Sequence, residues 1–144
     1  MYIVEGKMTN GHWISGIFKD ELNAQQYYNG ISSSREEKKS LVIKQIPIES
    51  FPFYMVRGSF GFEFFSSLEE TENFLRNFKA EKEKGGTDEI FNLYYIERDI
   101  SNKSMLGGDC LALSEHFMVD ANTLSDICEQ GLRQFLQVHS ELFN

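Results

Sequence analysis

The sequence has few cysteines and no long apolar run, and these absences exclude several classes of protein. Only Cys110 and Cys128 occur among 144 residues, and two cysteines without a spacing pattern do not make a disulfide framework. No apolar stretch approaches the roughly 20 residues that a membrane-spanning helix requires. The start of the sequence lacks the basic and apolar regions and the cleavage site of a secretory signal. We therefore expect a soluble, cytoplasmic protein with no membrane partner.

Basic residues are also scarce, which argues against broad nucleic-acid binding because lysine and arginine must neutralise the phosphates. The net charge is −8, and it is distributed unevenly along the chain. Residues 1–84 carry twelve acids and eleven bases, whereas residues 85–144 carry ten acids and three bases. Such an asymmetry is able to steer a basic partner. The alternative is that the acids only keep the surface soluble.

Aromatic residues are plentiful, and seven of them lie between residues 51 and 65. Their spacing predicts a β-hairpin, with Gly58-Ser59 at the centre of a type II′ turn. Opposed residues share a face of a sheet, so large apolar side chains gather on one face that must be covered. The predicted opposed pairs are Arg57 with Phe60, Met55 with Phe62, and Phe53 with Phe64.

The first thirty residues predict a second hairpin and a helix. Thr9-Asn10-Gly11-His12 is typical of a type I′ turn between strands at 2–8 and 12–18, which would pair Met8 with Trp13 and Val4 with Ile17. A helix over 20–29 follows, with Asp20 as its N-cap and Gly30 after its end. Trp13 is then expected in the core, although an exposed anchor for a partner is the alternative. A loop at 32–39 and a strand at 40–48, ending near Pro47, complete this region.

The hairpin–helix unit recurs after residue 53. Ser67 and Glu70 form a capping box for a helix that Gly85-Gly86 ends, and a strand follows at 90–98. The units at 2–30 and 53–84 share their order of elements, which suggests an internal repeat. The residue matches at a constant offset are Phe18 with Phe64, Leu22 with Leu68, and Tyr28 with Phe74.

The tail breaks this repeat. It predicts a loop over 101–109, a short helix at 109–118 and a long amphipathic helix at 122–142. We therefore expect one α+β domain over 1–144, with an antiparallel or mixed sheet of five to six strands and helices packed on one face. The long C-terminal helix is a candidate cover for the aromatic face. That face comprises Phe53, Met55, Phe60, Phe62 and Phe64.

Candidate catalytic residues are few. Cys110 and His116, with a nearby carboxylate, form a possible nucleophile–base pair or metal site, but their spacing matches no zinc motif. Cys128 and His139 lie on the apolar stripe of the predicted long helix, which indicates a structural role. We expect no enzymatic activity, no cofactor and no metal.

Two further motifs have simple structural interpretations. Glu97 and Asp99 are paired carboxylates, yet no third acid or base accompanies them, so a solvated strand end is the better interpretation. Gly107-Gly108-Asp109 lacks the lysine and serine or threonine of a phosphate-binding loop, which favours an ordinary loop and helix cap.

In size, acidity and lack of a catalytic motif, the chain is similar to the small immunity proteins that neutralise bacterial toxins. The resemblance implies a non-catalytic acidic protein that binds a basic protein partner such as a toxin domain. The candidate contact residues are Glu97, Asp99, Asp109, Glu115, Asp126 and Glu129. A small Cys/His-dependent enzyme or metal-binding protein and a homodimeric regulatory or structural subunit are the alternatives.

Overall fold

A computed structural model describes residues 1–144 apart from 9–10, 60, 86–89, 103–107 and 141–144. The described chain forms two compact units, and each unit is assembled from two separate segments. Unit 1 comprises Met1–Pro52 with Ile96–Ser114, and unit 2 comprises Phe53–Tyr95 with Glu115–Asn144. Each unit contains a four-stranded sheet, so the α+β class is confirmed and the single sheet of five to six strands is wrong. That the chain is one folding domain stays a prediction.

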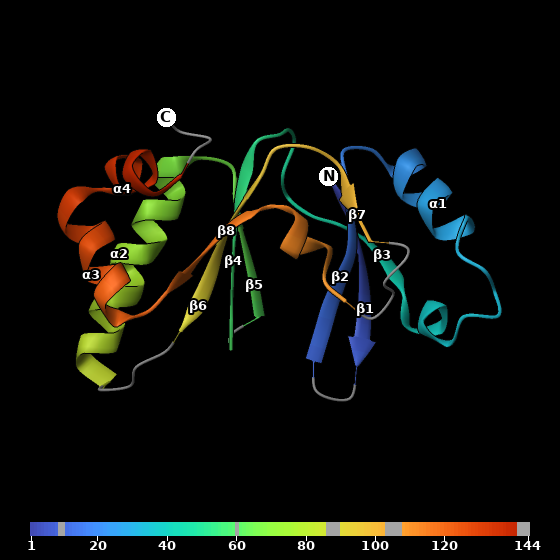
Figure 1. The fold of residues 1–144 in the computed structure, drawn as a ribbon, viewed down its shortest axis with the longest axis horizontal. Coiled ribbons are helices and arrows are strands. Elements are labelled where there is room, and N and C mark those ends of the chain that lie inside the picture. The colour runs from blue at the N-terminus through green and yellow to red at the C-terminus, as the bar shows by residue number, and fades with distance from the viewer. Residues whose placement is uncertain (9–10, 60, 86–89, 103–107, 141–144) are drawn as a thin grey trace. The chain divides into compact units, whose positions relative to one another are not determined.

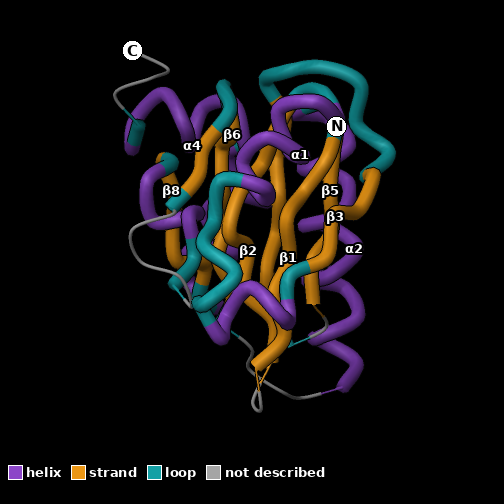
Figure 2. The backbone as a smooth tube through the Cα atoms, turned by 90° about the vertical axis from the view of Figure 1, so that its right-hand side faces the viewer, coloured by secondary structure: helices purple, strands orange, loops and turns teal. Residues whose placement is uncertain are grey.

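Unit 1 is built around an antiparallel sheet with the strand order β3-β1-β2-β7 (Figure 1). Figure 2 shows β1 between β2 and β3. Helix α1 (Glu21–Asn29) follows the first hairpin, and a 3₁₀ turn over Glu36–Ser40 precedes β3. The Asp20 side chain accepts a hydrogen bond from the Asn23 amide, so the predicted N-cap of α1 is confirmed. The strands are β1 (Tyr2–Met8), β2 (Gly11–Phe18), β3 (Val42–Gln45) and β7 (Ile100–Ser101).

The hairpin of β1 and β2 forms, but its predicted register is wrong. Trp13 lies opposite Gly6 instead of Met8, and Met8 lies opposite Gly11. Of the predicted turn, residues 9–10 lie outside the described chain, whereas Gly11 and His12 belong to β2. A β-bulge then skips Ser15, so that Val4 lies opposite Gly16. One extra residue in a strand moves every later side chain to the other face. The sequence predicted that Val4 and Ile17 share a face, and the bulge places them on opposite faces instead.

The face of this sheet next to α1 holds the core of unit 1. Trp13 is only 3% exposed, and its indole ring lies directly over Gly6, where a methyl group would collide with it. The Phe18 ring lies over Gly16 in the same way. Trp13 is therefore a core residue, and the alternative of an exposed anchor is wrong. The buried residues of this cluster are Val4, Trp13, Phe18, Ala24, Ile31 and Leu41.

Unit 2 has a sheet with the strand order β5-β4-β6-β8, and its three helices lie on one side of it (Figure 1). The aromatic hairpin is displaced by two residues from the predicted register, with Met55 opposite Phe64 and Arg57 opposite Phe62. A shift of two preserves the faces, so these side chains do share one face. The elements are β4 (Phe53–Gly58), β5 (Gly61–Phe65), α2 (Leu68–Gly85), β6 (Phe91–Ile96), β8 (Glu115–Val119), α3 (Ala121–Gln130) and α4 (Leu132–His139).

The helices of unit 2 cover the other face of the aromatic hairpin from the one predicted. Tyr54, Val56 and Phe65 pack in the cluster that includes residues of α2, α3 and α4. Phe53 and Met55 are fully buried on the opposite face, and Phe62 is partly exposed beside Arg57. Residues 53–56 are thus buried on both faces, and in such a strand the pattern of apolar residues does not indicate which face the helices cover.

The tail differs most from the prediction. Instead of a helix at 109–118, a 3₁₀ turn over Cys110–Leu113 leads into strand β8. The long helix is broken at Gly131, whose φ of 92° interrupts the helical backbone between α3 and α4. The first amide of α4, from Leu132, donates a hydrogen bond of 2.6 Å to the Glu72 carboxylate of α2. A side chain from another helix therefore caps α4.

The internal repeat is confirmed in its order of elements, but its true offset is 47 residues. Asp20 caps α1 as Ser67 caps α2, and the Ser67 hydroxyl accepts a hydrogen bond from the Glu70 amide. The ring contact of Phe18 with Tyr27 recurs as Phe65 with Phe74. The matches proposed from the sequence were thus one residue out of register. The shared strand orders are β3-β1-β2 and β6-β4-β5, while β7 and β8 extend opposite edges.

We expect Glu72→Ala to lower the free energy of unfolding by about 1–2 kcal/mol, because the Leu132 amide loses its capping acceptor. Urea denaturation followed by circular dichroism measures the change. Glu72→Gln keeps an acceptor oxygen and should restore part of the loss. Glu69→Ala, an exposed acid of the same helix, is the matched control. Equal stability of the Glu72→Ala and Glu69→Ala variants would show that the cap does not contribute.

Candidate functional site

The negative charge of the chain is concentrated in one unit of the structure. Unit 2 contains thirteen acids and six bases, whereas unit 1 contains nine acids and eight bases. Unit 2 therefore carries −7 of the net charge of −8. Within the residues that the structure describes, unit 2 contains ten acids and six bases and unit 1 contains nine acids and seven bases, so the excess of acid is again larger in unit 2.

The six predicted contact residues divide equally between the units. Glu97, Asp99 and Asp109 belong to unit 1, and Glu115, Asp126 and Glu129 belong to unit 2. The structure thus places three of them in the nearly neutral unit and three in the acidic one.

In unit 1, two of these carboxylates hold neighbouring backbone in place. Asp99 accepts a hydrogen bond of 2.9 Å from the Lys19 amide and another of 3.4 Å from the Asn23 side chain. Asp109 accepts a hydrogen bond of 2.8 Å from the Ile14 amide of β2. Glu97 is exposed just after β6. Asp99 and Asp109 therefore have structural roles, and their hydrogen bonds within unit 1 would compete with contacts to a partner.

In unit 2, the acids lie on β8 and α3, which Asp120 alone separates. Asp126 and Glu129 are exposed on α3, three residues apart, while Leu124 and Ile127 are buried on its other side. Residues one helical turn apart are neighbours on a helix surface, so these two carboxylates project into solvent close together. Glu115, at the start of β8, is partly buried.

Asp120 is an acid that the sequence prediction missed. Its side chain accepts a hydrogen bond of 2.8 Å from the Thr123 amide and caps α3. This hydrogen bond lowers the pKa of the Asp120 carboxyl, so the group stays ionised. An aspartate three residues before a threonine at a helix start is the signal that could have identified it. Residues 115–131 thus hold four acids and neither lysine nor arginine.

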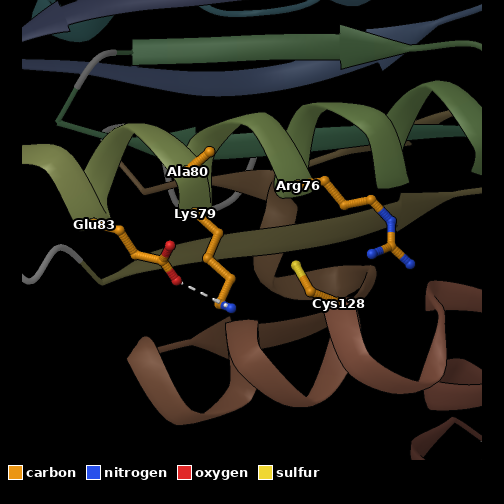
Figure 3. A pocket seen from close by; sticks show the side chains of 5 residues that line it. All are labelled: Arg76, Lys79, Ala80, Glu83 and Cys128. Carbon is orange, nitrogen blue, oxygen red and sulfur yellow. Dashed lines mark ion pairs between the residues drawn. The ribbon is translucent and has the colours of Figure 1, made fainter.

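A shallow pocket of about 220 Å³ lies between α2 and α3 in unit 2 (Figure 3). Arg76, Lys79, Ala80 and Glu83 of α2 line one side, and Cys128 of α3 faces them. The Lys79 ammonium lies 3.2 Å from the Glu83 carboxylate. The α2 side of the pocket is thus cationic in part, in contrast to the acids on the outer side of α3.

The surroundings of the Cys128 thiol in this pocket make it only a moderate nucleophile. Burial raises its pKa, while the nearby cations Arg76 and Lys79 offset part of that effect. The thiolate is the reactive form of cysteine, so a raised pKa slows its reactions near neutral pH.

The alternative of a Cys110–His116 centre is poorly supported by the structure. Cys110 is fully buried in unit 1, and burial raises the pKa of its thiol to about 12. A nucleophilic cysteine needs a lowered pKa and access to substrate, and Cys110 has neither. His116 belongs to unit 2, where its ring contacts that of Tyr94. Within the described ranges, no three His, Cys, Asp or Glu side chains lie close enough together to hold a metal ion.

A buried carboxylate in unit 1 was not predicted from the sequence. Glu5 of β1 is only 7% exposed, and its two oxygens lie 2.7 Å from His12 Nδ1 and 2.6 Å from Lys44 Nζ. The three residues belong to adjacent strands, and Lys44 and His12 are each about half exposed. A buried charge requires such partners, so the cluster ties β1 to its two neighbours.

Comparison with known proteins finds no match among protein-family models, curated proteins or solved structures. Among the helices of the described residues, none is both long enough and apolar enough to cross a bilayer. The features of the molecule that bear on function are therefore its distribution of charge and the surface that carries it.

The two cysteines should differ in reactivity towards a thiol reagent such as dithionitrobenzoate. We expect one thiol per chain, Cys128, to react in the folded protein at mildly alkaline pH, and two to react in denaturant. The reason is that Cys110 is inaccessible and its pKa of about 12 leaves almost no thiolate. Cys128→Ser should abolish the native reaction, and Cys110→Ser should leave it unchanged. Rapid reaction of Cys110 in the folded protein would revive the enzyme alternative.

Proposed function

We propose that this chain is a non-catalytic binding protein whose unit 2 presents an acidic surface to a basic protein partner, similar in this respect to the immunity proteins that neutralise bacterial toxins. The observation that carries the proposal is the confinement of −7 of the net charge to unit 2. Within that unit, Glu115, Asp126 and Glu129 are the candidate contacts. Glu97, Asp99 and Asp109 in unit 1 remain candidates from the sequence prediction.

The position of these acids supports a role in association. Asp126 and Glu129 project from the outer side of α3, whereas the buried side of α3 packs into the core of unit 2. Charge-neutralising variants at these exposed positions therefore have little reason to disturb folding. A surface of one sign raises the local concentration of an oppositely charged partner and speeds their encounter. Such charges contribute more to association rate and specificity than to affinity.

The alternative of a small Cys/His-dependent enzyme is not supported by the positions and pKa values of the two cysteines. Neither cysteine combines a low pKa with an accessible position, because burial raises the pKa of both thiols. The pocket at Cys128 is small beside the roughly 300–1,000 Å³ typical of small-molecule sites. A binding protein without catalysis is the function that these features favour.

Co-expression with the products of adjacent reading frames tests the proposal. If a neighbouring product arrests growth and this chain restores it, the protein is acting as an inhibitor of that product. The purified pair should then form a complex, and its association rate should fall at least about tenfold between about 50 and about 500 mM salt because salt screens the charges. An association rate indifferent to salt would remove the electrostatic argument.

Paired substitutions locate the surface. We expect Asp126→Asn with Glu129→Gln to slow association with that partner several-fold, because two charges are lost from the proposed surface. Glu21→Gln with Glu49→Gln, two exposed acids of unit 1, changes the net charge equally and is the matched control. Identical rates for the two double variants would place the contact elsewhere.

A further inference from the structure

Strand β8 ends the sheet of unit 2. It pairs with β6 through an antiparallel register in which Leu93 lies opposite Phe117 and Asn92 lies opposite Met118. In the part of the chain that the structure describes, no strand lies beyond β8 in the sheet. The outer edge of a terminal strand presents backbone groups on which another strand can form.

The other sheet edges carry features that discourage such pairing. Strand β3 contains Lys44 and is soon followed by Pro47, and β7 has only two residues. Strand β5 has the exposed Glu63 at its centre. Charged side chains, prolines and short length are the usual protections of an edge strand.

Strand β8 has less protection than these. Its one acid, Glu115, is partly buried at the first residue of the strand, residues 116–119 include no lysine, acid or proline, and Met118 is 63% exposed. Methionine is a flexible side chain that is well suited to contacts with varied partners. Of the four terminal strands, β8 is thus the one whose composition favours strand addition.

We propose that a basic, extended segment of a protein partner adds to unit 2 as a fifth strand along the outer edge of β8. The inference rests on the proposed function and names the element through which the partner is held. Backbone hydrogen bonds along Phe117–Val119 would supply affinity, and side chains on alternate positions would supply selectivity.

The acidic residues in and after β8 favour a positively charged segment of the partner. Residues 115–131 carry four acids and neither lysine nor arginine, so a lysine- or arginine-rich segment is complementary to this surface. A second copy of the same chain is disfavoured, because symmetric pairing of two β8 edges would bring like charges together.

The two faces of β8 predict the pattern of the added strand. Phe117 points to the helical side, where its ring packs at 5.9 Å on that of Phe135 in α4, and Glu115 shares that face. Met118 points to the opposite face. A segment with basic residues on the helical side and apolar residues beside Met118 fits both faces, which is a simple alternation of the two types.

A synthetic peptide of alternating lysine and valine is the probe, with its binding measured by isothermal titration at low salt. The control is the same peptide methylated at alternate backbone nitrogens, which keeps the charge but removes the donors needed for strand pairing. We expect the methylated peptide to bind at least about tenfold more weakly. Equal binding of the two peptides, or no binding of either, would overturn the inference.

A matched pair of variants locates the site. Met118→Lys places a positive charge on the β8 edge, and Val138→Lys places the same charge on α4 at an equally exposed position of 64%. We expect Met118→Lys to weaken binding of the unmethylated peptide at least about tenfold, and Val138→Lys to change it less than about threefold. Equal effects of the two substitutions would overturn the inference.

The experiments distinguish a failure of strand addition from a failure of the proposed function. If Asp126→Asn with Glu129→Gln slows association with the natural partner while Met118→Lys and Val138→Lys bind that partner equally, the acidic surface is used without strand addition. Sedimentation at several concentrations adds a further outcome. A dimer that Met118→Lys dissociates would show that a second copy occupies the edge, against the inference.

Discussion

The hydrogen bond from the Leu132 amide to the Glu72 carboxylate joins α4 to α2 within the helical layer of unit 2. Gly131 allows the backbone to leave α3 in a conformation that other residues rarely adopt, and Glu72 then caps the helix that restarts. The buried residues of α3 and α4 then pack in one core cluster of unit 2. Asp126 and Glu129 lie on the exposed side of α3, away from its buried residues Leu124 and Ile127.

Local features of the sequence predicted much of the fold. The N-caps of α1 and α2, the two hairpins and the repeated order of elements all follow from short-range chemistry that the sequence displays directly. Helix ends are well predicted because the cap residue and its amide partner lie within three residues of each other. The same locality explains why the repeat was recognised although its offset was one residue in error.

The errors arise where distant residues decide the outcome. The bulge at Ser15 is associated with contacts to other elements, since the Ser15 hydroxyl lies 2.6 Å from that of Tyr27, and its carbonyl accepts from the Asn102 amide. Strand β8 was predicted as helix because its run of three apolar residues, Phe117–Val119, is too short to show a clear period, and its pairing with β6 determines its conformation. For the candidate site, the uneven charge along the chain could be seen in the sequence. Its assignment to one unit could not be predicted, because each unit is assembled from two separate segments.

The two halves of the repeat differ in how their sheets end. Each half contributes three strands in the same order, yet the added strand lies beside the second hairpin strand in unit 1 and beside the strand after the helix in unit 2. Two identical units would present equivalent borders for association. Because β7 and β8 extend opposite borders, the two units are not equivalent there, and this disfavours self-pairing into open-ended polymers.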